Sequence, residues 1–200
     1  MQNDAVVFGT LDGQVSMLER AQGDEIWKRD LQAPVTSSLA FLGDELVVGT
    51  RGSVLAGLHP ATGATKWRLG FWGSWVESTP VTCGDGLACV GSSDLRRVLC
   101  FDPRDGRIVW RTDVFGWSWG RPLVHGDTIY VATGGVSPYD IRHVASLTAL
   151  ERKTGKIRWR SPVPRPPRSL HWGYASGAAL DGDTLVIGGL DGTLQGLPGS

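Results

Sequence analysis

The stretch ATGATKWRLG (61–70) decides the fold, because its glycine four residues before a tryptophan recurs along the chain. The other copies are AQGDEIWKRD (21–30), RDGRIVWRTD (104–113) and KTGKIRWRSP (153–162). Successive tryptophans of this motif are 40, 43 and 49 residues apart. A repeat of roughly 40 to 50 residues is typical of a four-stranded propeller blade.

Further segments recur between these markers, as in STPVTCGD (78–85), GLACVGS (86–92) and RVLCFDPRDG (97–106). The Gly-Asp pair predicts a hairpin turn, since glycine adopts positive φ at little cost. We therefore predict an all-β propeller of four-stranded antiparallel blades, with strands A to D running outward from the channel. The predicted repeats make one domain over 1–200 and span 5–31, 33–70, 76–114, 118–163 and 174–200, the first and last being incomplete.

This pattern resembles the pyrroloquinoline-quinone-like β-propeller repeat family, whose hallmark is the Gly-x-x-x-Trp docking motif. The resemblance implies that each docking tryptophan (Trp27, Trp67, Trp110 and Trp159) packs against a neighbouring blade. The family includes quinone-dependent dehydrogenases, scaffolds of outer-membrane assembly and sensor domains, so the resemblance predicts the fold but not the function. In its enzymes the quinone lies beside a disulfide of adjacent cysteines, and acidic and amide groups hold calcium. This sequence has no Cys-Cys pair and no such ligand cluster, so we expect neither quinone nor another cofactor.

Five repeats leave three arrangements open. The chain closes as a five-bladed ring, forms part of a longer propeller, or is completed by a second copy as a homodimer. Unpaired sheet edges invite pairing with another chain. We expect the five-bladed ring, because Met1 looks like a genuine start.

Charge and composition restrict the classes of partner. Lys and Arg number 20, as do Asp and Glu, so no charge excess indicates nucleic acid or an anionic membrane. The N-terminal MQNDAVVFGT (1–10) has neither a basic flank nor an apolar leader. Cys83, Cys89 and Cys100 form an odd, clustered set, which favours reduced, partly buried thiols, and their spacing does not indicate zinc. We therefore expect a cytoplasmic protein, or one trimmed from a secreted precursor.

Five tryptophans remain once the docking motif is assigned. All of them stand between strand D of one repeat and strand A of the next: Trp72, Trp75, Trp117, Trp119 and Trp172. Antiparallel strands alternate in direction, so D–A and B–C connections leave a blade on one face, at the mouth of the channel. Adjacent glycines leave room for a ligand, and tryptophan is enriched at binding hot spots. The alternative is that the rings only plug a narrow centre.

We therefore predict a binding propeller with a tryptophan-lined pocket for a hydrophobic or aromatic small molecule or a peptide. The predicted lining is Trp72, Trp75, Trp117, Trp119, Arg121, Tyr139, Trp172 and Tyr174. A second hypothesis is an enzyme that uses this pocket for acid–base cyclisation, elimination or isomerisation of an aromatic or polyene-like substrate, with Glu77 and His171 as catalytic residues and no metal. Surrounding rings would desolvate Glu77, which suits a general acid; alternatively Glu77 pairs with Arg97 or Arg121. A third hypothesis is a protein-interaction scaffold.

Overall fold

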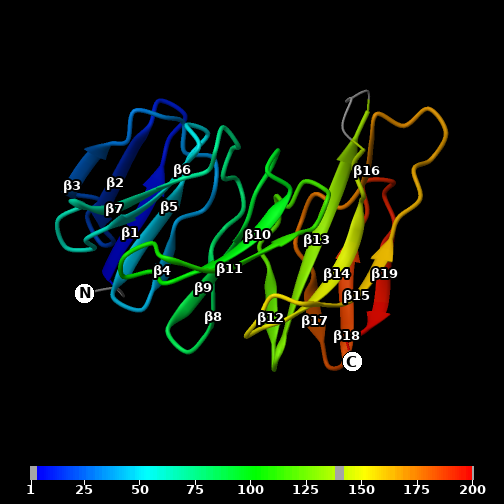
Figure 1. The fold of residues 1–200 in the computed structure, drawn as a ribbon. Coiled ribbons are helices and arrows are strands. Elements are labelled where there is room, and N and C mark those ends of the chain that lie inside the picture. Colours follow the sequence, from blue (N-terminus) through cyan, green and yellow to red (C-terminus); the bar gives the residue numbers. More distant parts are fainter. Residues whose placement is uncertain (1–3, 138–141, 200) are drawn as a thin grey trace.

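The computed structural model describes residues 4–137 and 142–199. It consists of five antiparallel sheets that follow one another in chain order and form an arc (Figure 1). Nearly all of the regular structure is β-strand, as the sequence predicts. No helix in the described ranges is long and apolar enough to cross a membrane.

Each sheet pairs strands that are consecutive in the sequence. The first sheet comprises β1 (Ala5–Gly9), β2 (Gln14–Glu19) and β3 (Glu25–Asp30), and the second β4 (Ala40–Leu42), β5 (Glu45–Gly49), β6 (Val54–Leu58) and β7 (Thr65–Gly70). The third comprises β8 (Val81–Gly84), β9 (Leu87–Gly91), β10 (Arg97–Phe101) and β11 (Ile108–Asp113). The fourth comprises β12 (Leu123–His125), β13 (Thr128–Val136), β14 (Ser146–Glu151) and β15 (Ile157–Pro162), with β16 (His171–Gly173) paired to the far end of β13. The fifth comprises β17 (Ala179–Asp181), β18 (Thr184–Gly188) and β19 (Leu194–Pro198).

The inner strands of the second, third and fourth sheets are buried on both faces, because each of these sheets lies between two others. In β5, Leu46 and Val48 pack in a cluster with the first sheet, while Val47 packs in a cluster with the third. Alternate residues of one strand therefore serve two different junctions. This explains why the inner strands are continuous apolar runs rather than alternating ones.

The docking motif builds the first three junctions between sheets in the same way. The Trp67 indole donates a hydrogen bond to the Pro103 carbonyl of the third sheet at 2.8 Å. Its ring covers Gly106, where an added Cβ would lie 2.6 Å from a ring carbon. The glycine of one motif thus receives the tryptophan of the preceding motif. The same contacts join Trp27 to Pro60 and Gly63, and Trp110 to Arg152 and Gly155.

At each end of the arc, one partner of the docking contact is missing among the described residues: the tryptophan at the first sheet and the glycine at the fifth. A Cβ added to Gly23 would meet nothing within 4 Å. At the other end, the Trp159 indole makes no hydrogen bond within 4–137 and 142–199. Gly199 holds the position equivalent to Pro103, but its carbonyl accepts from the Tyr130 hydroxyl instead.

The five-bladed ring that we expected is not formed. The first and last sheets lie at opposite ends of the arc (Figure 1). Among the described residues, four hydrophobic clusters each join two consecutive sheets, and none joins the first sheet to the fifth. Three docking contacts and the packing of the fifth sheet on the fourth make four junctions, and these do not complete a turn.

A buried aspartate stabilises the turn before the third docking motif. Asp102 is buried and accepts hydrogen bonds from the Arg104 backbone (3.0 Å) and Nε (2.9 Å). The guanidinium lowers the pKa of Asp102 to about 2. A lowered pKa adds stability above the unfolded-state value, and this stability is lost as pH falls through the folded value.

Asp102→Asn is therefore expected to reduce the free energy of unfolding at pH 7 by about 1–2 kcal/mol. The wild-type advantage should shrink between about pH 4 and pH 2. Urea unfolding at pH 7 and at about pH 2, followed by tryptophan fluorescence, measures both the loss and its pH dependence. The control is Asp105→Asn, since Asp105 is exposed and accepts one backbone bond in the same turn. Equal losses for the two variants would contradict the prediction.

Candidate functional site

The connections between sheets gather on one face of the arc, seen at the top of Figure 1. The segments 71–80, 114–122 and 163–178 link consecutive sheets there, beside the loops 50–53 and 92–96 within sheets. Backbone hydrogen bonds tie the two kinds of segment together, from Val76 to Thr50 (3.1 Å) and from Ser118 to Ser92 (3.0 Å). We call the surface formed by these five segments the loop face.

Two aromatic side chains project from the loop face at unusual backbone positions. Trp72 has φ of 48° and Phe115 has φ of 62°, both in the left-handed region that bulky residues rarely adopt. Trp72 is 61% exposed and Phe115 is 44% exposed. The Arg160 guanidinium lies 5.1 Å from the Phe115 ring centre, and burial lowers its pKa. Both loops therefore combine backbone strain with exposed aromatic surface.

A charged pair frames the next tryptophan. The Arg51 guanidinium lies 4.5 Å from the centre of the Trp75 ring and donates to the Glu77 carboxylate at 2.7 and 3.0 Å. Trp75 remains 42% exposed. The alternative expectation that Glu77 pairs with Arg97 or Arg121 is wrong, because Arg97 bonds Asp113 and Arg121 is exposed without contacting Glu77. Arg51 was missed because it lies in a short loop of the preceding sheet, which the structure brings beside Glu77.

Trp117 and Trp119 form a more enclosed pair. Their ring centres are 4.8 Å apart, and the His143 ring lies 5.1 Å from that of Trp117. Trp117 donates to Asp94 at 3.0 Å, and Trp119 donates to Ser93 at 3.3 Å. Trp117 is buried and Trp119 is half-buried. These bonds fix the two rings to the 92–96 loop.

Trp172 and Tyr174 are buried at the far side of the loop face. The Tyr174 hydroxyl donates to Gln195 at 3.0 Å, and burial raises its pKa. The Arg165 guanidinium lies 5.4 Å from the Trp172 ring centre. A cavity of about 420 Å³ opens here, lined in part by Trp172, His143, Arg142 and Arg165. None of the other four extra tryptophans lines it.

The predicted site residues therefore separate into two groups. Trp72, Trp75 and the half-buried Trp119 reach the surface, whereas Trp117, Trp172 and Tyr174 are buried. His171 is exposed on β16 of the fourth sheet, and no hydrogen bond joins it to Glu77 in the described part of the chain. Tyr139 lies outside the described residues.

The donor set for a quinone centre is not found on the loop face. The three cysteines are buried between the third and fourth sheets, and no two are adjacent in sequence. Within the described ranges, these thiols make the one group of three ionisable side chains close enough to share a metal ion. No carboxylate cluster of the kind that holds calcium accompanies them among these residues. We derive no quinone chemistry from this chain.

Comparison with known proteins places the chain among propellers. A family model described as outer membrane protein assembly factor BamB matches residues 11–94 and 51–199. A quinohemoprotein alcohol dehydrogenase of Comamonas testosteroni is 27% identical over 179 residues, covering 77% of this chain and 24% of the relative. The assembly factor BamB of Bordetella pertussis is 27% identical over 170 residues, covering 82% and 40%. The structure of BamB from Moraxella catarrhalis superposes with a TM-score of 0.79 at 19% identity, covering 99% of this chain and 59% of that one.

Two consequences follow from these relatives. The chain spans less than half the length of the curated proteins that it matches. The expectation of a cytoplasmic location is wrong, because the matching family and the Bordetella relative are named for assembly of outer membrane proteins. That expectation rested on the lack of a leader next to the first strand, and a targeting leader is not part of the folded repeats.

Proposed function

Because the chain belongs to the pyrroloquinoline-quinone-like repeat family whose model is described as outer membrane protein assembly factor BamB, we propose that it is a protein-interaction scaffold. Its loop face binds a partner protein. The exposed aromatic residues Trp72, Trp75 and Phe115 supply the contact, and Arg51 and Arg160 flank it. Tryptophan and arginine are the residues most enriched at protein–protein hot spots.

The exposed aromatic rings of Trp72 and Phe115 carry this proposal. A left-handed conformation costs roughly 1–2 kcal/mol for a residue with a side chain. Exposure of each ring also forfeits the gain from burying it. The left-handed backbone also occurs at Gln32 (φ 59°), the equivalent position after the first sheet, so it belongs to the repeat. Exposure of the two rings is the feature that folding alone does not favour, and it supports a role in binding. Broad, exposed rings of this kind suit the surface of another protein better than an enclosed small molecule.

The first test asks what touches the loop face in the producing cell. A photo-activatable amino acid at position 72 is expected to give a discrete protein adduct. The same residue at Asp44, exposed in the β4–β5 turn at the opposite end of its sheet, should not give it. Adducts of equal pattern at both positions, or none at position 72, would argue against a scaffold that works through this face.

Once that partner is identified, Trp75→Ala is expected to weaken its binding by about 30-fold, the loss typical of a hot spot of 2 kcal/mol. Val109→Ala is the matched control, because Val109 is 41% exposed on the outer strand β11. It should change affinity by less than about twofold. Calorimetry with the purified partner measures both. A similar affinity for the two variants would exclude Trp75 from the interface.

The cavity beside Trp172 supports a second candidate, the binding of a small aromatic ligand. It offers an aromatic wall with the guanidinium groups of Arg142 and Arg165, which suits an anionic or π-rich molecule. Such a ligand would quench tryptophan fluorescence in the wild type but much less in Arg165→Ala. The enzyme hypothesis would need turnover that depends on Glu77 and His171; the Glu77 carboxylate already accepts two hydrogen bonds from Arg51.

A further inference from the structure

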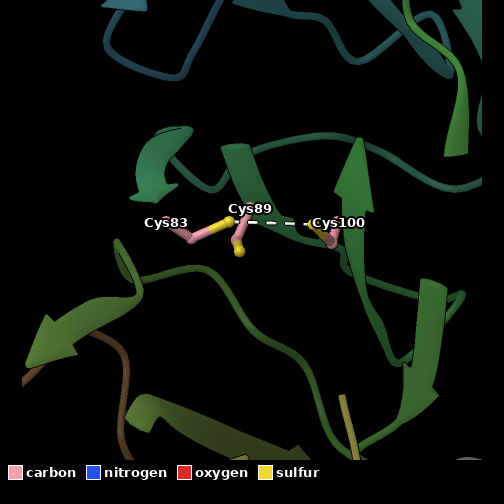
Figure 2. Close-up of side chains that lie close together, drawn as sticks. All are labelled: Cys83, Cys89 and Cys100. Carbon is pink, nitrogen blue, oxygen red and sulfur yellow. Dashed lines mark hydrogen bonds between the residues drawn. The ribbon is translucent and has the colours of Figure 1, made fainter. Parts of the chain in front are cut away.

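All three cysteines of the chain lie on the face of the third sheet that packs against the fourth. Cys83 lies on β8, Cys89 on β9 and Cys100 on β10 (Figure 2). Cys89 is the direct cross-strand partner of Cys100, and Val81, two residues before Cys83, is the partner of Cys89. The three sulfur atoms lie within 4.8 Å of one another, and those of Cys83 and Cys100 are 3.7 Å apart.

This spacing matches that of sulfur ligands around one metal ion. At a metal–sulfur distance of about 2.3 Å, ligands are about 3.8 Å apart in a tetrahedral site and about 4.0 Å apart in a trigonal one. The strands therefore already hold the thiols near coordination distance. We infer that Cys83, Cys89 and Cys100 form a binding site for a soft, thiophilic metal cation, of which cuprous copper fits best.

Packing does not account for the three thiols. By strand register, the second sheet has other side chains at the same positions, and so does the fourth. These are Leu42, Val47 and Gly57 in the second sheet, and His125, Tyr130 and Ala149 in the fourth. The sizes range from glycine to tyrosine, so the junction accepts many shapes. Three cysteines at one junction need a chemical reason.

An arginine from the next sheet places a positive charge beside the thiols. Arg152 reaches over Gly84, where any side chain would collide with its Nη1. Nη1 donates to the Cys83 carbonyl at 3.0 Å, and Nη2 to Asp127 at 3.2 Å. Its Nε is buried without a hydrogen-bond partner in the structure as described. Three thiolates with one monovalent ion leave two negative charges. Arg152, which also pairs with Asp127 (3.2 Å) and Asp85 (3.9 Å), offsets at most one of them.

The ligand set selects the metal. Thiolates favour Cu(I), zinc and iron–sulfur clusters, but a structural zinc site takes four ligands. In the described ranges, no histidine, aspartate or glutamate joins the three thiols in the cluster. Three sulfurs without a fourth protein ligand therefore favour Cu(I). Binding releases the thiol protons to solvent, and a cavity of about 580 Å³ lined by Val81 and Thr82 brings solvent close to Cys83.

The test is an anaerobic titration of the reduced full chain with Cu(I) in competition with a chromogenic Cu(I) chelator. One ion per chain is expected, with a thiolate-to-metal charge-transfer band. Cys89→Ser should weaken the affinity by at least about 100-fold, since losing an outer-shell partner already costs 10- to 100-fold. Val47→Ser, the same position in the second sheet, is the control for packing and should keep the wild-type affinity. Circular dichroism of each metal-free variant shows that it is folded.

Three results would overturn the inference. The first is no binding of one ion by the folded, reduced wild type. The second is equal affinity of Cys89→Ser and Val47→Ser. The third is a mass lower by two hydrogen atoms in the protein as isolated, restored by reductant, which identifies a disulfide instead. A parallel titration with Zn(II) must give weaker binding than Cu(I), and tighter zinc binding would overturn the choice of metal.

Discussion

Trp67→Ala is expected to lower the free energy of unfolding by about 3–5 kcal/mol, the range for removing a large, well-packed aromatic side chain. The substitution empties the junction between the second and third sheets. It removes the hydrogen bond to Pro103, the stacking on Gly106 and the edge contact with Phe101, whose ring centre lies 6.0 Å away. It also leaves the Pro103 carbonyl without its indole donor. Urea unfolding at neutral pH, followed by far-ultraviolet circular dichroism, measures the change.

The chain contains a matched control for this substitution. Trp159 belongs to the same motif and is half-buried like Trp67, but its indole makes no hydrogen bond in the described residues. It packs beside Tyr130, at 6.0 Å between ring centres. Trp159→Ala should therefore cost clearly less, about 1–2 kcal/mol. Equal losses would mean that ring burial alone, and not the docking geometry, stabilises the junction.

The second large effect is the difference in free energy of unfolding between the variants Gly106→Ala and Gly23→Ala. Both glycines have positive φ, 75° and 78°, so both variants pay a similar backbone cost of about 1 kcal/mol. At Gly106 the new methyl group would also collide with the Trp67 ring, whereas at Gly23 it would meet nothing within 4 Å. Overpacking of this kind adds about 1–3 kcal/mol. We expect total losses of about 2–4 kcal/mol at Gly106 and about 1 kcal/mol at Gly23.

The double variant Trp67→Ala with Gly106→Ala separates the two causes. Removing the ring removes the collision, so the glycine substitution should then cost about as much as it does at Gly23. Thermal unfolding of the four proteins gives the coupling between the two positions. Strict additivity would show that the glycine is needed for its backbone alone and not to receive the ring.

The sequence predicted the repeat well, because each strand and turn depends on local pattern. The Gly-x-x-x-Trp spacing correctly indicated the propeller, and the Gly-Asp pairs lie at turns such as that between β12 and β13. Ring closure could not be predicted in this way. It depends on the angle between sheets, which the packing of whole faces sets.

The candidate site shows the same limit. Alternating strand direction predicted that the loops would share one face, but not which rings are buried. Trp117 and Trp75 hold equivalent positions. Asp94 and His143 enclose Trp117, whereas Trp75 is contacted by Arg51 and stays exposed. The cysteine cluster was likewise invisible in the spacing, since only strand pairing brings Cys83 and Cys100 together.

The unmatched ends of the arc give the molecule a polarity. At one end no tryptophan ring packs on Gly23, and at the other end the Trp159 ring packs on no motif glycine among the described residues. A face-to-face dimer would place like against like and satisfy neither end. Any further blade, from this chain or from another copy, would therefore have to join head-to-tail. Two copies related by rotation about the channel axis would match ring to glycine at both seams, so the direction of the docking motif sets the permitted symmetry.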